Sequence, residues 1–159
     1  MNPTFVHLVR HAEAGQRARW PGPDLTRPLS QGGHRQAERL TELFAGEPFT
    51  QLLSSPFLRC TETFEPLAAT RGLAIETRDE LADAQPWEYL QKVVLESEGE
   101  GPTGICVHGE ALRGLMHDLF DRGVAQPGRE DFRKGSTWVL GVRDGAIISA
   151  RHFQAPSAE

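Results

Sequence analysis

Residues 5–14 read FVHLVRHAEA, an apolar run that ends abruptly in an arginine and a histidine. Four apolar residues among residues 5–9 predict a short buried strand. Ligands of open α/β sheets bind beyond the carboxyl ends of the strands, so Arg10 and His11 are expected at the mouth of a site. A guanidinium group offers paired donors that match phosphate oxygens, and a neutral imidazole can attack phosphorus to form phosphohistidine. The pair therefore predicts phosphoryl chemistry.

Length and composition set the class of protein. The 159 residues predict a single domain, residues 1–159, that is large enough to bury a substantial core. A hydrophobic share of 38% and a charged share of 25%, without a long apolar run, are typical of a soluble globular protein and argue against a membrane partner. Met1 to Pro3 lead straight into the first strand, so we expect no signal sequence and a cytoplasmic location. The net charge of −5 argues against a nucleic-acid partner.

The pattern of apolar and turn residues predicts strands that alternate with helices. Strands are expected at residues 5–9, 50–54, 73–77, 105–107, 137–142 and 146–150, the last two joined by a hairpin turn at Asp144-Gly145. Helices are expected to begin after Ser30, at Pro56, at Pro86 and after His108. Within the second helix, Pro66 predicts a kink or an early end. The alternation indicates an α/β domain whose mostly parallel sheet finishes in a C-terminal hairpin.

Polar residues follow three of these strands, each at the turn before a helix. The turns are Arg10-His11, Ser54-Ser55 and His108-Gly109, and they can converge at one edge of the sheet. Arg59 falls in the first turn of the second helix, where free N–H groups and the helix dipole favour an anion. Two arginines, two histidines and helix N-termini therefore predict a compact anion pocket.

Several segments together resemble the histidine phosphatase, or phosphoglycerate mutase-like, superfamily. They are LVRHAE at residues 8–13, LSSPFLR at 53–59 and CVHG at 106–109. The stretch DLTRPLSQGG at 24–33, followed by Gln36-Ala37, is most similar to the short SixA-like phosphohistidine phosphatases, and it also resembles the phosphatase domain fused to some Nudix hydrolases. The likeness spans nearly the whole chain and implies a three-layer α/β/α sandwich.

The resemblance implies a role for each matching residue. His11 would be the nucleophile that carries the phosphoryl group. The residues implied to hold that group are Arg10, His11, Arg59 and His108. The family's general acid falls on Asp83, in the register Leu81-Ala82-Asp83. Because Asp is one methylene shorter than the Glu of many members, Glu80 and water stay open as alternative proton donors.

Other polar residues have two interpretations each. Glu13 and Glu110 either brace the pocket or face solvent. The loop residues Arg17, Arg19, Trp20 and Arg27 either contact the substrate or are solvated. The histidines lack the spacing of a metal site, so we expect no metal and no other cofactor.

The resulting hypothesis is a metal-independent phosphatase that works through a phosphohistidine on His11. Short loops predict an open site, which suits a phosphorylated small molecule or a phosphohistidine-bearing protein as partner. Two alternatives stay open. One is a noncatalytic module that only binds phosphoryl groups, and the weaker one is a cofactor-dependent phosphomutase.

Overall fold

The computed structural model describes residues 2–129 and 131–159, which form a six-stranded sheet with the strand order β3-β2-β4-β1-β5-β6. The strands are β1 (Thr4–Arg10), β2 (Gln51–Ser54), β3 (Ile75–Thr77), β4 (Thr103–Val107), β5 (Thr137–Arg143) and β6 (Ala146–Phe153). The neighbours β3, β2, β4 and β1 run parallel, and β5 and β6 add an antiparallel hairpin beside β1. The predicted α/β class, with a mostly parallel sheet and a C-terminal hairpin, is confirmed.

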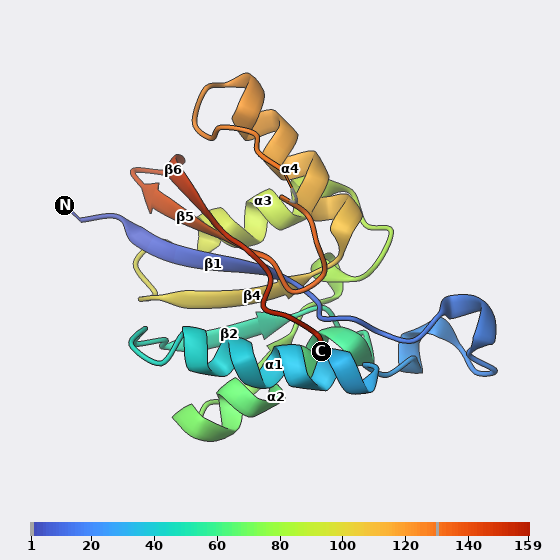
Figure 1. The fold of residues 1–159 in the computed structure, drawn as a ribbon. Helices are drawn as coiled ribbons and strands as arrows, with labels where there is room; N and C mark the ends of the chain where they lie inside the picture. The colour runs from blue at the N-terminus through green and yellow to red at the C-terminus, as the bar shows by residue number, and fades with distance from the viewer. Residues whose placement is uncertain (1, 130) are drawn as a thin grey trace.

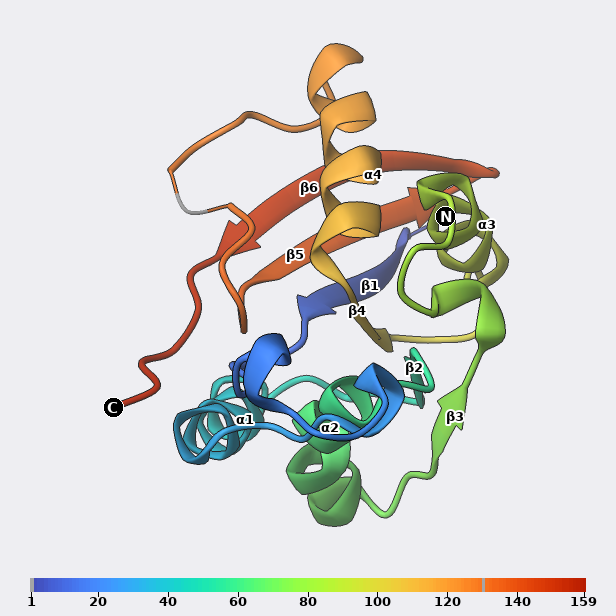
Figure 2. The ribbon, with the colours of Figure 1, turned by 90° about the vertical axis from the view of Figure 1, so that its right-hand side faces the viewer.

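Two pairs of helices cover the two faces of the sheet and complete the predicted three-layer sandwich (Figures 1 and 2). The helices are α1 (Gln31–Leu43), α2 (Leu58–Arg71), α3 (Trp87–Glu96) and α4 (Gly109–Asp121). One core packs Leu40 of α1 and Phe64 of α2 against the sheet, and the other packs Leu90 of α3 and Leu112 of α4. In the described part of the chain, no helix has the length and apolar character that crossing a bilayer requires.

Strand β1 lies inside the sheet, bonded to β4 on one side and to β5 on the other. Because side chains alternate along a strand, Val6 and Leu8 enter one core while Val9 enters the other. All three are fully buried, which explains the apolar residues on both faces of this strand, whereas Phe5, expected in the same buried run, is 46% exposed. The strand therefore delivers Arg10 and the following His11 to the interior of the carboxyl-end edge.

The helix α2 begins two residues later than the Ser-Pro pair predicts. It begins at Leu58 with Phe57 as its N-cap, not at Pro56. The Ser55 hydroxyl accepts the N–H of Phe57 at 3.2 Å and lies 2.8 Å from a ring nitrogen of His108. Because this hydroxyl contacts the candidate site, it does not cap the helix in the expected way.

Pro66 does not end α2, so of the two predicted outcomes, a kink or an early end, the early end does not occur. The helix continues to Arg71 with the proline inside it. A proline removes a single backbone donor, while Phe64 and Leu67 on either side of it are buried in the core shared with α1. Packing of these side chains outweighs the lost hydrogen bond.

The hairpin between β5 and β6 has the turn that its sequence predicts. Asp144 and Gly145 have φ angles of 53° and 74°. A two-residue turn with both φ angles positive matches the twist of the flanking strands, and Asp-Gly is favoured there. The third strand, in contrast, is shorter than expected and covers only Ile75–Thr77.

Helix α1 packs its first turn against the backbone that follows β1. The Ser30 hydroxyl accepts the N–H of Gly33 at 3.0 Å, and the Ser30 N–H donates to the carbonyl oxygen of Glu13 at 3.0 Å. A Cβ atom on Gly33 would overlap that same carbonyl oxygen. Glycine is therefore required for the close approach of α1 to this segment.

Replacing Gly33 by alanine is expected to lower the free energy of unfolding by about 1–3 kcal/mol, because α1 must move away from Glu13. Urea denaturation followed by circular dichroism measures the change. Gly46→Ala is the matched control, because a Cβ atom there meets nothing within 4 Å. Equal unfolding midpoints for Gly33→Ala and Gly46→Ala would contradict this account of the contact.

Candidate active site

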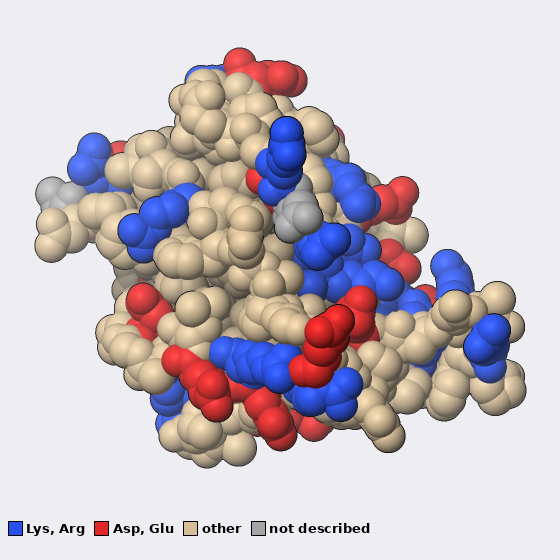
Figure 3. Space-filling view, in the orientation of Figure 1, with Lys and Arg blue, Asp and Glu red and all other residues tan. Residues whose placement is uncertain are grey.

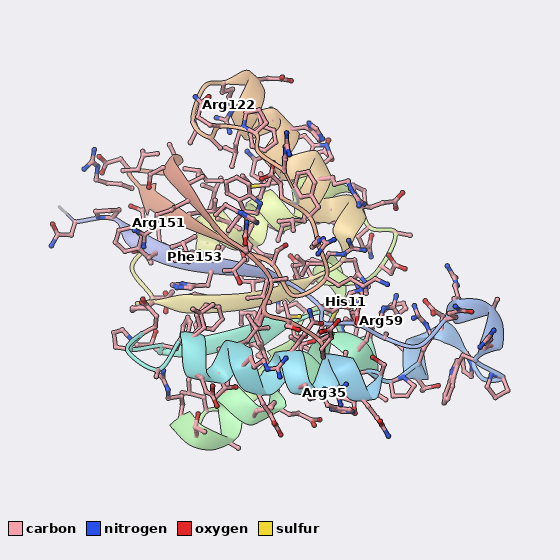
Figure 4. The ribbon with its side chains drawn as sticks, viewed as in Figure 1. His11, Arg35, Arg59, Arg122, Arg151 and Phe153 are labelled. Carbon is pink, nitrogen blue, oxygen red and sulfur yellow. The ribbon has the colours of Figure 1, made fainter. Side chains whose placement is uncertain are left out.

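The carboxyl ends of β1, β4 and β2 meet at one edge of the sheet, where residues from the segments that follow these strands line a cavity of about 390 Å³. Backbone hydrogen bonds hold the turns together. The His11 N–H donates to the Val107 carbonyl and the Ser55 N–H donates to the Cys106 carbonyl, each at 3.1 Å. Figure 4 labels His11 and Arg59 at this edge. The cavity lining brings together the four residues expected to hold a phosphoryl group, namely Arg10, His11, Arg59 and His108.

The His11 imidazole is buried, with 5% of its surface exposed. Its Nδ1 lies 2.8 Å from the carbonyl oxygen of Ala12, and because a carbonyl only accepts, Nδ1 carries the ring proton. The other nitrogen, Nε2, keeps its lone pair. Burial is the main cause that lowers the pKa of His11, and the hydrogen bond to Ala12 opposes it. The positive charges of His108, Arg59 and Arg10 lower the pKa further, so that it falls to about 3. The imidazole is therefore neutral at physiological pH, as a nucleophile requires.

The Arg10 guanidinium lies against the first residue of α4. A Cβ atom on Gly109 would lie 2.9 Å from Cζ of Arg10, so the helix must begin with glycine here. Nη1 of Arg10 donates to the carbonyl oxygen of Phe132 at 2.5 Å. Its Nε is buried without a hydrogen-bond partner in residues 2–129 and 131–159. An unpartnered buried donor is costly unless a ligand satisfies it, so this N–H is available to an anion.

Arg59 extends from the first turn of α2 as a buried cation between two carboxylates. Its Nη2 lies 3.1 Å from Oδ2 of Asp24 and 3.4 Å from Oδ2 of Asp83. Its Nη1 donates to the carbonyl oxygen of Asp24 at 3.1 Å. Like Arg10, it has a buried Nε with no partner among the described residues. Two arginines thus face the cavity region with one unsatisfied N–H each.

Asp24 organises the arginines of the loop between β1 and α1. It accepts a hydrogen bond from Nε of Arg27 at 2.9 Å and lies 3.8 Å from Nε of Arg17, in addition to its contact with Arg59. Burial by itself would raise the pKa of Asp24, but the hydrogen bond from Arg27 and the charges of Arg59, Arg27 and Arg17 lower it. The carboxylate therefore stays ionised and holds three guanidinium groups beside the cavity.

His108 lies close to the nucleophile, with 5.5 Å between the centroids of its ring and that of His11. Its Nε2 is 2.8 Å from Oγ of Ser55, and its Nδ1 is 3.9 Å from Oδ1 of Asp83, which lines the cavity. When the Ser55 hydroxyl donates its proton to Nε2, a neutral His108 carries its own proton on Nδ1. That tautomer presents an N–H to a phosphoryl oxygen.

Of the two carboxyl groups expected to donate a proton, the structure brings Asp83 to the cavity and leaves Glu80 outside it. Glu80 is 2.8 Å from Nη2 of Arg78 and 3.8 Å from Nζ of Lys92, and these ion pairs hold it away from the lining. Glu110, in the first turn of α4, does line the cavity. Among the described residues, Asp83 and Glu110 are therefore the carboxyl-bearing side chains that line the cavity.

The loop between β1 and α1 contributes Arg17 and Arg27 to the cavity lining. Arg19 and Trp20 line an adjoining hollow of about 360 Å³, which Arg27 also borders. Glu13 borders a different hollow and not the cavity of His11. Of the residues with two open interpretations, Glu110, Arg17 and Arg27 are thus at the site.

The sequence pattern assigns no role to three residues that the structure places at or beside the cavity, namely Asp24, Arg113 and Lys134. Ser55, which the pattern places in one of the converging turns, contacts His108. A signal exists for Arg113. It follows Gly109 by four residues in a helix, a spacing that puts both on one face. The contact of Asp24 with Arg59 joins residues 35 positions apart, and only the folded chain reveals it.

No group of three or more His, Cys, Asp or Glu side chains suited to holding a metal ion occurs within residues 2–129 and 131–159. The donors of the cavity are instead dominated by guanidinium N–H groups, which bind anions rather than metal cations. The chemistry that this arrangement can carry out is binding of an oxyanion beside a neutral imidazole.

Comparison with known proteins agrees with this chemistry. A family model described as the histidine phosphatase superfamily (branch 1) matches residues 6–93. The chain is 35% identical over 155 residues to the 8-oxo-(d)GTP phosphatase of Mycolicibacterium smegmatis (strain ATCC 700084 / mc(2)155), a match that covers 95% of this chain and 48% of that protein. The chain thus spans about half the length of this relative.

Two solved structures share the fold. The protein histidine phosphatase SixA complexed with tungstate has a TM-score of 0.76 at 18% identity, over 98% of this chain and 97% of that one. The mycobacterial glucosyl-3-phosphoglycerate phosphatase with inorganic phosphate has a TM-score of 0.69 at 18% identity, over 98% of this chain and 98% of that one. The family model and the 35% identical relative show that this chain belongs to the histidine phosphatase superfamily.

Proposed function

We propose that this chain is a phosphatase that transfers a phosphoryl group to Nε2 of His11 and then hydrolyses the phosphohistidine. One observation carries the proposal. A neutral imidazole, with its proton fixed on Nδ1, lies in a cavity that Arg10, Arg59 and His108 also line. Phosphoryl transfer depends on positioning and on positive charge around the equatorial oxygens, which paired guanidinium donors supply.

The reaction takes two displacements. First, the Nε2 lone pair of His11 attacks phosphorus, the bond to the leaving oxygen breaks, and that oxygen keeps the electron pair and takes a proton from Asp83. Second, Asp83 accepts a proton from water as the water oxygen attacks phosphorus. The P–N bond then breaks, its electron pair returns to Nε2, and phosphate leaves. Tungstate and phosphate, which occupy the two solved relatives, are tetrahedral oxyanions like the group transferred here.

The proposed substrates are phosphorylated small molecules or protein phosphohistidine. The cavity of about 390 Å³ lies within the roughly 300–1,000 Å³ of small-molecule sites. Among the relatives, one is a phosphatase of a nucleotide and another is a protein histidine phosphatase. We place the activity in the cytoplasm, a reducing compartment that keeps thiols free, as Cys60 and Cys106 are here.

Rapid quenching tests the intermediate. The enzyme is mixed with a radiolabelled phosphomonoester and quenched in base within milliseconds, and peptide mapping locates the label. We expect a base-stable, acid-labile phosphoryl group on His11 during steady-state turnover. Turnover without any label on His11 would overturn the proposed mechanism, and the absence of turnover on every phosphate ester tried would overturn the proposed activity.

Replacing Asp83 by asparagine is expected to reduce kcat/KM most for esters with poor leaving groups, by about 10²–10⁴-fold for an alkyl phosphate. The loss with p-nitrophenyl phosphate should be at least about tenfold smaller, because its leaving oxygen needs little protonation. Steady-state assays on both esters measure the difference. Glu80→Gln is the matched control, since this carboxyl group lies outside the cavity. Equal losses on both esters would exclude Asp83 as the proton donor.

A further inference from the structure

The cavity carries more positive charge than one phosphoryl group requires. Among the described residues, its lining includes six arginine and lysine side chains but two carboxylates, Asp83 and Glu110. Figure 3 shows Lys and Arg side chains gathered in a patch near the start of α4 and the loop that follows β1. Because the whole chain has a net charge of −5, this patch is a local concentration and not a general property of the surface.

The cations on the two sides of the cavity differ in their partners. On one side, Asp24 pairs with Arg17, Arg27 and Arg59. On the other side, Arg113 and Lys134 have no carboxylate within ion-pair distance in the described part of the chain, and the Arg113 guanidinium lies 5.6 Å from the ring centroid of Phe132. These two side chains are therefore cations without a close carboxylate partner among the described residues, and Glu13 acts on Lys134 only from beyond ion-pair distance.

The backbone holds Arg113 and Lys134 close to the reacting groups. The N–H of Gly135, the residue after Lys134, donates to the carbonyl oxygens of Arg10 and His11 at 3.0 and 3.1 Å. Arg113 lies one turn into α4, on whose first residue the Arg10 guanidinium packs. Arg113 and Lys134 thus flank Arg10.

These cations repel one another across the cavity. Burial, followed by the charge of Arg113, lowers the pKa of Arg10. Burial, followed by the charge of Arg10, lowers the pKa of Lys134, although the charge of Glu13 opposes the shift. An anion bound between the three cations would relieve this repulsion.

Two further hollows border the cavity on this same side. An adjoining hollow of about 750 Å³ shares Arg10 and Lys134 with the cavity of His11. A second one, of about 360 Å³, shares Arg10 and Arg113. Arg10 thus borders the cavity and both hollows, so a ligand held at His11 that extends past Arg10 would meet Arg113 or Lys134.

We propose that Arg113 and Lys134 form a second anionic subsite, which takes the inner phosphoryl group of a phosphoanhydride such as a nucleoside diphosphate. This inference rests on the proposed function of His11. The Nε2 lone pair attacks the terminal phosphorus, the bond to the bridging oxygen breaks, and the electron pair stays on that oxygen as part of the nucleoside monophosphate. Water then attacks the phosphohistidine, releasing phosphate and restoring Nε2.

The subsite also stabilises the negative charge that develops on the leaving group, which a proton would otherwise neutralise. In a phosphoanhydride, the leaving oxygen belongs to a phosphate whose negative charge Arg113 and Lys134 can stabilise directly. The shorter reach of Asp83, compared with a glutamate, then matters less. The structure thus favours substrates with two adjacent phosphoryl groups over simple alkyl phosphates.

The kinetic test compares deoxyguanosine diphosphate with deoxyguanosine monophosphate, which differ by one phosphoryl group. We expect the wild type to have the higher kcat/KM on the diphosphate, and Arg113→Gln/Lys134→Gln to reduce the ratio of the two values by about 10–100-fold. Arg122→Gln is the control, because Arg122 lies at the far end of α4, paired with Asp118 at 2.9 Å (Figure 4). An unchanged ratio in the double variant would overturn the subsite.

A binding test separates the subsite from the catalytic proposal. Calorimetry on His11→Asn, which lacks the nucleophile, measures the affinities for inorganic pyrophosphate and inorganic phosphate. We expect pyrophosphate to bind at least about tenfold more tightly, and the added substitutions Arg113→Gln and Lys134→Gln to remove most of that advantage. Equal affinities before the added substitutions would overturn the subsite even if His11 is phosphorylated. If His11→Asn binds pyrophosphate tightly but the wild type is never phosphorylated on His11, only the proposed mechanism is overturned and the subsite stands.

Discussion

Replacing His11 by asparagine is expected to lower kcat for p-nitrophenyl phosphate by about a thousandfold or more, since the reaction loses the atom that bonds to phosphorus. Asparagine can still donate to the Ala12 carbonyl, so the shape of the cavity should persist while the nucleophilic lone pair is lost. Release of p-nitrophenol, followed at saturating substrate, measures the loss. His34→Asn is the control, because this exposed histidine on α1 lies away from the cavity lining.

The same variant also tests whether His11 is neutral in the folded protein. The pKa of His11 falls from 6.5 in the unfolded chain to about 3 in the folded one, so between these pH values the unfolded state binds a proton that the folded state does not. Acidification through this window therefore destabilises the wild type through His11 by about 1.4 kcal/mol per pH unit. His11→Asn does not have this pH-dependent loss. Urea unfolding should therefore show that the free energy of unfolding of the variant, relative to that of the wild type, rises as the pH is lowered from 7 to 5. A difference in stability that does not depend on pH, or turnover equal to the wild type, would contradict the role of His11.

The central part of the site is predictable from sequence because its residues follow strand ends. An apolar run without alternation indicates a strand buried on both faces, and such a strand lies inside the sheet. Arg10 and His11 come directly after that strand, so their place at the carboxyl-end edge follows from the pattern. His108 follows the neighbouring strand in the same way.

The parts that escape prediction depend on contacts between distant residues or on side-chain direction. The Asp24 and Arg59 contact forms only when the loop before α1 folds back onto α2. The Ser-Pro signal at residues 55–56 is correct in type, but the Ser55 hydroxyl contacts His108, 53 positions away. Glu80 lies in the expected loop, yet its ion pair with Arg78 decides where its carboxyl group lies. A short stretch of sequence does not show which other side chains will bind these polar groups in the folded chain.

Replacing Arg59 by alanine is expected to reduce kcat/KM for p-nitrophenyl phosphate by about 10²–10³-fold, the loss typical of removing one preorganised donor to a developing charge. Arg59→Lys should recover only part of the activity, because an ammonium group keeps the charge but not the planar fork. Steady-state assays and the inhibition constant of tungstate measure both effects. Arg35→Ala, an exposed arginine on α1 (Figure 4), is the control.

Arg59 also braces the loop through Asp24, so a loss of activity alone does not identify its role. Asp24→Asn separates the two, because it keeps the guanidinium group and removes the carboxylate that pairs with it at 3.1 Å. If Arg59 binds the phosphoryl group directly, Arg59→Ala weakens tungstate inhibition by about 10-fold or more, while Asp24→Asn, whose Arg59 is still charged, weakens it less. Equal weakening by both substitutions would show that Arg59 acts by holding Asp24. The Nε of Arg59 is buried without a hydrogen-bond partner among the described residues, and a donor that a bound phosphoryl group can satisfy favours direct binding.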